Sequence, residues 1–264
     1  MNASDAAFAG SIPALYDRHL APLLFEPFAR VVAERAAALR PQRILETAAG
    51  TSVVTAALHD ALPEAEIVAT DLNQGMLDVA ARRFASDKVR LAAADAQALP
   101  FEPARFDLVV CQFGVMFFPD KVEANREARR VLRDGGHYLA VIWDRLERNP
   151  VSKAASQAVA ELFPGNPPRF LERTPFGYGD PTWIEHDLVA AGFTDIEFET
   201  VVRTSRVKAR DAAAGLALGS PLRAEIEARD PAMLDAAVEA AAAALAPWEG
   251  QDGPMSAHLV TAVK

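Results

Sequence analysis

The sequence predicts an α/β fold built on a doubly wound, seven-stranded and mostly parallel sheet with helical covers. Short apolar runs alternate with amphipathic helical stretches between Arg43 and Trp143. The first three runs each end at an acidic residue: Glu46, Asp71 and Asp95. Continuously apolar strands that alternate with helices indicate a parallel sheet covered on both faces.

Seven segments have the apolar character of strands. The expected strands are 43–46, 67–71, 89–94, 106–112, 138–143, 196–207 and 258–263. Helices are expected between them, because apolar residues recur there at a spacing of three or four. One of these helices, 181–191, has Pro181 at its start and Gly192 just beyond its end, which is the usual placement of these two residue types.

The whole chain, 1–264, is expected to form one domain. Residues 1–40 form an N-terminal helical cover broken by prolines, and residues 41–144 form the ligand-binding core. Proline and glycine interrupt 145–180, as is typical of a loop-rich cover over a binding site, and 209–246 is alanine-rich and helical. Both segments are interpreted as insertions over or beside the core.

Composition narrows the classes of partner. The 264 residues are 51% hydrophobic and carry a net charge of −9, with a sequence pI of about 5.1. This acidity disfavours nucleic acid and anionic membranes as partners, because both require clustered cations. A single cysteine, Cys111, excludes an internal disulfide and a cysteine-based metal cage, and no apolar run is long enough to span a bilayer. We therefore expect a cytoplasmic protein with a small-molecule partner and no metal.

The three acids that end successive strands predict the position of the ligand site. Ligands of doubly wound sheets bind outside the carboxyl ends of the strands, so Glu46, Asp71 and Asp95 are expected to line one crevice. Asp71 is suited to accept hydrogen bonds from ribose hydroxyls, and Asp95 with Ala96 and Gln97 to recognise an adenine edge. Alternatively, Glu46 and Asp71 cap the helices that follow them.

Four runs of the chain, in order, resemble motifs of class I S-adenosylmethionine-dependent methyltransferases. The runs are Ile44–Ser52, Ala69–Leu77, Ala94–Phe101 and Phe106–Phe113. Within that family, the resemblance is to the branch of ubiquinone/menaquinone-biosynthesis C-methyltransferases, and it covers residues 40–145 well. It implies a Rossmann-like fold, S-adenosyl-L-methionine as cofactor, S-adenosyl-L-homocysteine as product, and methyl transfer to a small, partly apolar acceptor.

The resemblance and the strand-end acids together predict a set of cofactor-binding residues. These are Tyr16, Glu46, Thr47, Ala48, Ala49, Gly50, Thr51, Asp71, Leu72, Met76, Asp95, Ala96, Gln97, Gln112 and Phe113. The resemblance implies that loop 48–50 holds the methionine moiety and that Leu72 and Met76 pack on the adenine. Gln112 and Phe113 would line both the cofactor and the acceptor. Tyr16 either folds over the cofactor or is a core aromatic residue.

The loop after the first strand departs from the family pattern at two positions. Ala48 and Ser52 stand where the family usually has glycine. We expect a slightly tighter loop that still binds the cofactor. The same loop argues against a nicotinamide-dependent dehydrogenase, whose fingerprint requires glycine at 48, 50 and 53, where the chain has Ala48, Gly50 and Val53.

The sequence identifies no strong candidate for a catalytic base. His19, in the N-terminal cover, and Asp144, at the end of the fifth strand, are the two weak candidates, and Asp144 otherwise caps a loop. Methyl transfer from a sulfonium depends largely on in-line positioning, so a base is not required. Phe113 and the cluster 116–118 form either an apolar acceptor wall or part of the core.

Three alternatives remain at this stage. One is a methyltransferase-like protein that binds S-adenosylmethionine without turnover. A protein or RNA methyltransferase is disfavoured by the acidity of the chain and by the absence of an added recognition domain. The 209–246 segment either extends the cover or pairs with a second subunit, which would give a homodimer.

Overall fold

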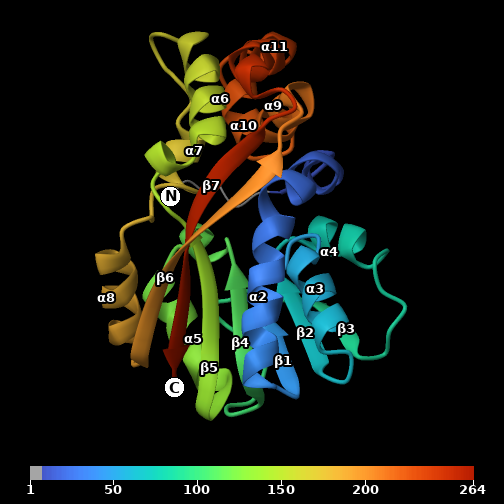
Figure 1. The fold of residues 1–264 in the computed structure, drawn as a ribbon, viewed down its shortest axis with the longest axis vertical. Coiled ribbons are helices and arrows are strands. Elements are labelled where there is room, and N and C mark those ends of the chain that lie inside the picture. The colour runs from blue at the N-terminus through green and yellow to red at the C-terminus, as the bar shows by residue number, and fades with distance from the viewer. Residues whose placement is uncertain (1–7) are drawn as a thin grey trace.

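The computed structural model describes residues 8–264 and contains a single seven-stranded sheet (Figure 1). Its strands are β1 (Arg43–Glu46), β2 (Glu66–Asp71), β3 (Val89–Ala93), β4 (Phe106–Gln112), β5 (Leu132–Trp143), β6 (Thr194–Arg206) and β7 (Asp252–Val263). They lie in the order β3-β2-β1-β4-β5-β7-β6, and only β7 runs against its neighbours. The predicted α/β fold with a mostly parallel, seven-stranded sheet is confirmed.

Two strands begin well before the positions that the sequence indicated. β5 begins at Leu132 instead of Tyr138, and β7 begins at Asp252 instead of His258. Gly253 and Pro254 weaken the strand signal in β7, but its first half pairs with β6 and gains its backbone partners there. His258 consequently lies in the middle of β7 instead of at its start.

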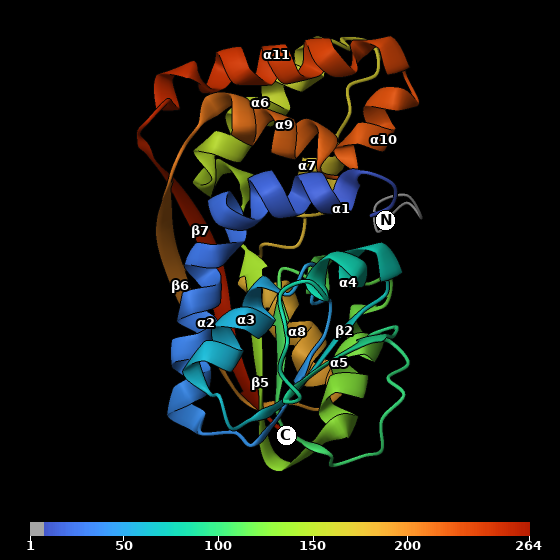
Figure 2. The same cartoon turned by 90° about the vertical axis from the view of Figure 1, so that its right-hand side faces the viewer.

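Helices cover both faces of the sheet. α2 (Glu26–Leu39) and α3 (Val53–Ala61) pack together, and α5 (Lys121–Val131) packs against α8 (Pro181–Ala191). Figure 2 shows the sheet between these two pairs. α4 (Gln74–Ala80) contacts β2 and β3. The helices thus leave the carboxyl ends of the parallel strands uncovered.

The N-terminal cover is one nearly continuous helical segment. α1 (Ile12–Leu15) leads into a π-helical stretch, η2 (Tyr16–Phe25), which leads into α2. Pro22 lies inside η2, where the widened turn accommodates a residue that cannot donate a backbone hydrogen bond. α2 ends at Leu39, and its C-cap residue, Arg40, has a left-handed φ of 51°. The helical pieces that were expected to be separated by prolines are therefore consecutive turns of one helical segment.

A layer of helices, here called the cap, lies beyond the carboxyl ends of the strands (Figures 1 and 2). The cap consists of α6 (Pro150–Glu161), α7 (Phe170–Arg173), α9 (Ala209–Leu218), α10 (Leu222–Glu227) and α11 (Leu234–Leu245). α11 packs on α9 and α6, so the two insertions 145–180 and 209–246 meet in this layer. The second insertion leaves the sheet and returns to it at the same place. There the Val207 N–H donates to the Gln251 carbonyl at 2.9 Å.

Within residues 8–264, none of the helices combines the length and apolar character needed to cross a bilayer.

Candidate active site

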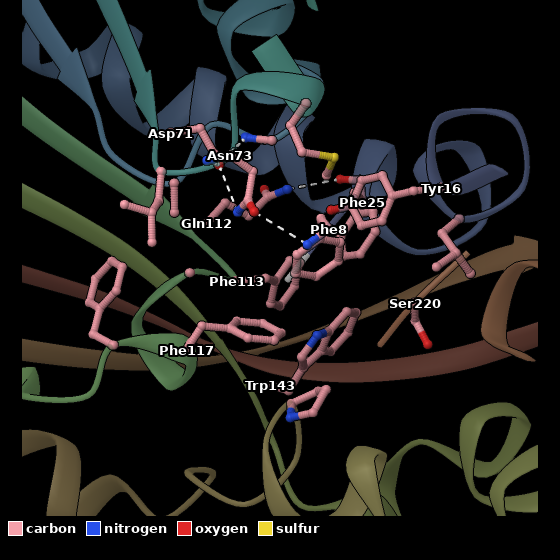
Figure 3. A pocket seen from close by; sticks show the side chains of 18 of the residues that line it. Phe8, Tyr16, Phe25, Asp71, Asn73, Gln112, Phe113, Phe117, Trp143 and Ser220 are labelled. Atoms are coloured by element: carbon pink, nitrogen blue, oxygen red, sulfur yellow. Dashed lines mark hydrogen bonds between the residues drawn. The ribbon is translucent and has the colours of Figure 1, made fainter. Parts of the chain in front are cut away.

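A cavity of about 340 Å³ lies between the carboxyl ends of the strands and the cap. Residues from the core, η2 and the cap line it (Figure 3). Among them are Tyr16, Phe25, Ala48, Gly50, Asp71, Leu72, Asn73, Met76, Asp95, Ala96, Gln97, Gln112, Phe113, Trp143, Ser152, Phe170, Phe176 and Ser220. The cavity therefore brings most of the predicted cofactor-binding residues together with residues of both insertions.

Asp71 lies at the core end of this cavity, where β2 stops. One carboxylate oxygen accepts the Gly50 N–H at 2.8 Å, and the other accepts the Asn73 N–H at 2.8 Å. Burial raises the pKa of the Asp71 carboxyl, and the hydrogen bonds from Asn73 and Gly50 oppose this effect. The side chain is thereby oriented at the junction of the two loops that follow β1 and β2.

The loop between β1 and α3 has a backbone that favours glycine at three positions. The φ angles are 52° at Ala48, 56° at Gly50 and 63° at Ser52. A left-handed conformation is unfavourable for residues with a Cβ. Ala48 and Ser52 therefore adopt the backbone conformation of a glycine-rich loop, and this conformation is strained for both residues.

Gly114 provides the space that Ala48 needs. A Cβ built on Gly114 would lie 2.5 Å from the Ala48 Cβ and 2.8 Å from the Cys111 Sγ. Both distances are shorter than van der Waals contact permits. A side chain is thus tolerated at position 48 because none is present at position 114.

We expect the Ala48→Gly variant to be more stable than the wild type by about 0.5–1 kcal/mol. Removal of the left-handed strain contributes about 1–2 kcal/mol, and the greater entropy of glycine in the unfolded chain offsets part of it. Urea unfolding measures the difference. The matched control is Ala49→Gly, because Ala49 has no positive φ; that change should lower stability. An equal loss in both variants would contradict the strain argument.

Glu46, the last residue of β1, is buried beside the same loop. Its carboxylate accepts a hydrogen bond from the Thr55 hydroxyl at 2.5 Å. Burial raises the pKa of Glu46 to about 8; the Thr55 hydrogen bond opposes this rise and the nearby Asp71 charge adds to it. The carboxyl is therefore protonated at neutral pH in the protein without a ligand.

A second, small cavity of about 20 Å³ adjoins Glu46. Ala49 and Thr51 also line it, while Tyr16, Phe25, Ala48 and Gln112 line both cavities. The second cavity is thus a polar recess behind the main one. The shared residues form the boundary between the two.

Aromatic rings and an amide make up that boundary. The Tyr16 and Phe25 rings stack with their centroids 4.9 Å apart. Gln112 Nε2 donates to the Phe25 carbonyl at 3.2 Å, which attaches the start of α2 to the end of β4 (Figure 3). Burial, followed by the charges of Asp71, Asp17 and Glu46, raises the pKa of Tyr16, so its hydroxyl keeps its proton.

Two buried polar atoms at the recess lack a hydrogen-bond partner among the described residues. They are Gln112 Oε1 and Thr51 Oγ1. A buried polar atom without a partner is costly, and such atoms are commonly satisfied by a ligand or by water. The recess is therefore prepared for a ligand that carries hydrogen-bond donors.

The adenine-binding residues predicted from the sequence lie along one side of the main cavity. Asp95 accepts the Gln97 backbone N–H at 2.8 Å, and the Gln97 side-chain oxygen Oε1 accepts the Asp120 N–H at 2.8 Å. Leu72 is 62% exposed although it follows the buried Asp71. Leu72 thus presents an apolar side chain to the cavity that the protein itself does not cover.

The cap side of the cavity, here called the aromatic lobe, is lined by aromatic rings. Phe113 and Trp143 stack with their centroids 3.7 Å apart, and Phe176 lies 5.6 Å from Trp143. Phe117 lies 6.3 Å from Phe170 of the cap. Within the part of the chain that the structure describes, Asp71 and Asp95 are the only ionisable acids that line the cavity, and no histidine, lysine or arginine does so.

The two weak candidates for a base are placed elsewhere. His19 lies 3.6 Å from Asp211 and does not line the cavity. The Asp144 carboxylate accepts from the Ser256 hydroxyl at 2.8 Å and from the Arg145 N–H at 2.7 Å, and it too lies outside the lining. Thr47, a predicted cofactor-binding residue, lines neither cavity; its N–H donates to the Val110 carbonyl of β4 at 2.9 Å.

Several lining residues were not identified from the sequence. Asn73 could have been identified. An aspartate side chain commonly accepts a hydrogen bond from the backbone N–H two residues further on, and Asn73 lies two residues after Asp71. Ser152, Phe170 and Phe176 belong to a cover whose presence was expected but whose inward-facing residues no local pattern reveals. Among residues 8–264 there is also no group of three histidine, cysteine or acidic side chains arranged to hold a metal ion.

Comparison with known proteins identifies the family. A model described as "Methyltransferase domain" matches residues 44–136. The demethylmenaquinone methyltransferase of Clavibacter sepedonicus is 33% identical over 179 residues, which cover 64% of this chain and 72% of that protein. The chain belongs to the class I S-adenosylmethionine-dependent methyltransferases.

Two further relatives within that class align with part of this chain. The demethylmenaquinone methyltransferase of Deinococcus radiodurans is 34% identical over 136 residues, 51% of this chain and 54% of that protein. The chain thus spans about half the length of this relative. The ubiquinone/menaquinone biosynthesis C-methyltransferase of Pseudomonas aeruginosa (strain LESB58) is 29% identical over 173 residues, 60% of this chain and 68% of that protein.

Solved structures share the fold at low sequence identity. A putative methyltransferase from Bacillus halodurans superposes with a TM-score of 0.58 at 20% identity and covers 89% of this chain and 98% of its own. Phosphoethanolamine N-methyltransferase 2 of Haemonchus contortus, in complex with S-adenosyl-L-methionine, superposes with a TM-score of 0.53 at 20% identity over 84% of this chain and 48% of its own. These likenesses support the Rossmann-like fold.

Proposed function

We propose that the two adjacent cavities bind S-adenosyl-L-methionine and, after transfer, S-adenosyl-L-homocysteine, and that the aromatic lobe, called the acceptor lobe from here on, binds a small, partly apolar methyl acceptor. The observation that carries the proposal is the recess with the unpartnered Gln112 Oε1 and Thr51 Oγ1. An amino acid moiety supplies the donors that these atoms lack. The larger cavity offers the acid and the apolar surfaces that suit a nucleoside.

The chain's residues divide between the two halves of this ligand. Asp71 would accept hydrogen bonds from the ribose hydroxyls, and Leu72 with Met76 would pack on the adenine. In the recess, Glu46 and Gln112 would face the ammonium group. Because acidic side chains attract cations and amide oxygens accept their protons, this end of the site has the polarity that an ammonium requires.

The remaining predicted residues complete the cofactor site. Tyr16, whose hydroxyl stays protonated, would donate a hydrogen bond from the boundary to the ligand. The backbone of loop 48–50 would hold the methionine moiety, and Asp95, Ala96 and Gln97 would recognise the adenine edge. Phe113, which stacks on Trp143, would separate the cofactor from the acceptor.

Positioning and the exclusion of water are the main contributions of these residues to the reaction. When bound, the sulfonium of the cofactor supplies the methyl group. The aromatic walls of the acceptor lobe hold an apolar molecule close to it, and alignment of two reactants can account for much of a rate enhancement. Among residues 8–264, no histidine, lysine or arginine lines the lobe, and we infer that the acceptor either enters in its reactive form or gives its proton to solvent.

We also infer that the chain works as one domain. A contiguous set of buried apolar side chains extends from Leu20 in η2 through the sheet to Leu245 in α11. The cap and the core therefore share one hydrophobic interior. Such sharing supports a rigid acceptor lobe.

Two measurements test the proposal. Calorimetry of the pure protein should detect S-adenosylhomocysteine binding, and a panel of small aromatic and aliphatic acceptors should include at least one that yields S-adenosylhomocysteine from S-adenosylmethionine. Absence of binding would refute the assignment of the cavities. Binding without product from any acceptor would instead favour a protein that binds the cofactor without turnover.

A further inference from the structure

We propose that His258 is a positioning residue of the acceptor lobe, because it fastens residues 174–180, which form one wall of the lobe, to the end of the sheet. The inference rests on the proposed function in one respect only, namely that the acceptor binds in this lobe. His258 does not line the cavity and would act through the wall.

His258 occupies a central place in the sheet. It lies in the middle of β7, in register with Ile142 of β5 on one side and Thr200 of β6 on the other. Its side chain is 7% exposed. A buried imidazole must have hydrogen-bond partners, and those of His258 come from outside its own strand.

Each ring nitrogen of His258 has a specific neighbour. Nδ1 lies 3.3 Å from the Thr200 hydroxyl, and Nε2 lies 3.3 Å from the Gly179 carbonyl oxygen and 3.5 Å from a carboxylate oxygen of Asp144. Both neighbours of Nε2 are acceptors, so Nε2 carries the proton, and in the neutral ring Nδ1 accepts from Thr200. The tautomer is therefore set by these contacts.

Asp144 is itself held in place on the side away from His258. Ser256, two residues before His258 on β7, donates its hydroxyl to the Asp144 carboxylate at 2.8 Å. Asn149 accepts the Ser256 N–H at 3.1 Å and donates to the Ser256 carbonyl at 3.2 Å. The result is a buried polar network that joins β7, the end of β5 and residues 174–180.

The network determines where the wall stands. Gly179 is so close to the end of β5 that an added Cβ would lie 2.8 Å from the Trp143 carbonyl oxygen and 2.9 Å from the Arg145 nitrogen. Three residues earlier, Phe176 packs on Trp143, and both side chains line the acceptor lobe. Fixing the Gly179 carbonyl therefore fixes the distance between the two aromatic sides of the lobe.

Other contacts hold the same segment from outside. Arg145 pairs with Asp180 at 2.9 Å, although the Arg145 side chain is 63% exposed, and the Tyr178 hydroxyl donates to Asp187 of α8 at 2.6 Å. These contacts anchor the end of the segment to Arg145 and to α8. The His258 contact joins the segment to β7, the strand beside Trp143.

The experiment compares the wild type with His258→Leu, which removes both hydrogen bonds, and with His258→Gln, whose amide restores a donor toward Gly179. Amide hydrogen exchange followed by mass spectrometry should show residues 174–180 exchanging at least fivefold faster in His258→Leu. Peptides from β1 and β4 should be unchanged, and His258→Gln should recover most of the protection. The matched control is His137→Leu, which alters a partly buried histidine in register with Val263 at the other end of the β5–β7 pair and should exchange like the wild type.

A second measurement addresses the lobe itself. N-phenyl-1-naphthylamine, a neutral aromatic fluorophore, should bind the wild type in the presence of saturating S-adenosylhomocysteine. His258→Leu should bind it at least fivefold more weakly while its affinity for S-adenosylhomocysteine stays within twofold, and His258→Gln should lie between the two. A parallel loss of both ligands indicates general loosening and overturns the proposal.

The remaining outcomes are also decisive. Unchanged exchange at 174–180 in His258→Leu overturns the fastening role of His258. A wild type that binds S-adenosylhomocysteine but not the naphthylamine overturns the link between this segment and the acceptor lobe. Failure of the wild type to bind S-adenosylhomocysteine refutes the proposed function, whereas the exchange experiment still tests the fastening role.

Discussion

Replacement of Asp71 by alanine is expected to weaken S-adenosylhomocysteine binding about 100-fold. Hydrogen bonds to a charged group contribute roughly 1.5–3 kcal/mol each, and every 1.4 kcal/mol is a factor of ten in affinity. The change would also remove the acceptor of the Gly50 and Asn73 N–H groups. The loops after β1 and β2 would then lose the side chain that holds them together. Isothermal titration calorimetry at pH 7.5 measures the effect.

Two control variants separate ligand contact from loss of fold. Asp78→Ala removes an exposed acid of α4 whose partner is Gln74, and its affinity should equal that of the wild type. Asp71→Asn keeps one acceptor oxygen and should show an intermediate loss. Wild-type affinity in Asp71→Ala, with its thermal unfolding unchanged, would exclude Asp71 from the cofactor site.

Binding of S-adenosylhomocysteine should also depend strongly on pH through Glu46. Burial raises the pKa of this carboxyl to about 8, so the protein without ligand holds a proton there at neutral pH. An ammonium group beside Glu46 favours the ionised form, so binding releases that proton. Affinity should therefore rise roughly 10- to 50-fold from pH 6 to pH 8, as expected when a proton must leave for the ligand to bind.

The same group has the opposite effect on stability. A carboxyl whose folded pKa lies above its unfolded value of about 4.5 stabilises the fold at low pH and loses that contribution as pH rises toward 8. Glu46→Gln should flatten both profiles between pH 6 and pH 8. Glu66→Gln, which alters the exposed first residue of β2, should leave both unchanged. If the affinity of the wild type did not vary over this range, Glu46 would not face the ammonium.

Local patterns in the sequence were sufficient to predict most of the fold. Apolar strands such as Phe106–Gln112 are continuous because both faces of the sheet are covered, and a continuous run is easy to recognise. The first half of β7 was not recognised. Residues 252–256 contain glycine and proline, and their strand conformation depends on pairing with β6, which no local pattern reports.

The candidate site, like the fold, could be predicted from the sequence only in part. Glu46, Asp71 and Asp95 stand at strand ends, and the topology of a doubly wound sheet brings strand ends together, so their proximity could be inferred. The roles of His258 and Asp144 could not. The two residues are 114 positions apart in the sequence numbering, and they meet because β7 lies antiparallel beside β5, a pairing set by the tertiary fold.

Both insertions that build the cap begin and end at nearly the same point of the sheet. Residues 208–250 are closed by the hydrogen bonds between Val207 and the segment 250–251, and residues 145–179 return to pack Gly179 against Asp144. The entropy of closing a loop grows slowly with its length, by only about 0.6 kcal/mol for each doubling. The length and sequence of either insertion can therefore change at little cost to the register of the sheet. One cofactor-binding core could thus be combined with caps that select very different acceptors.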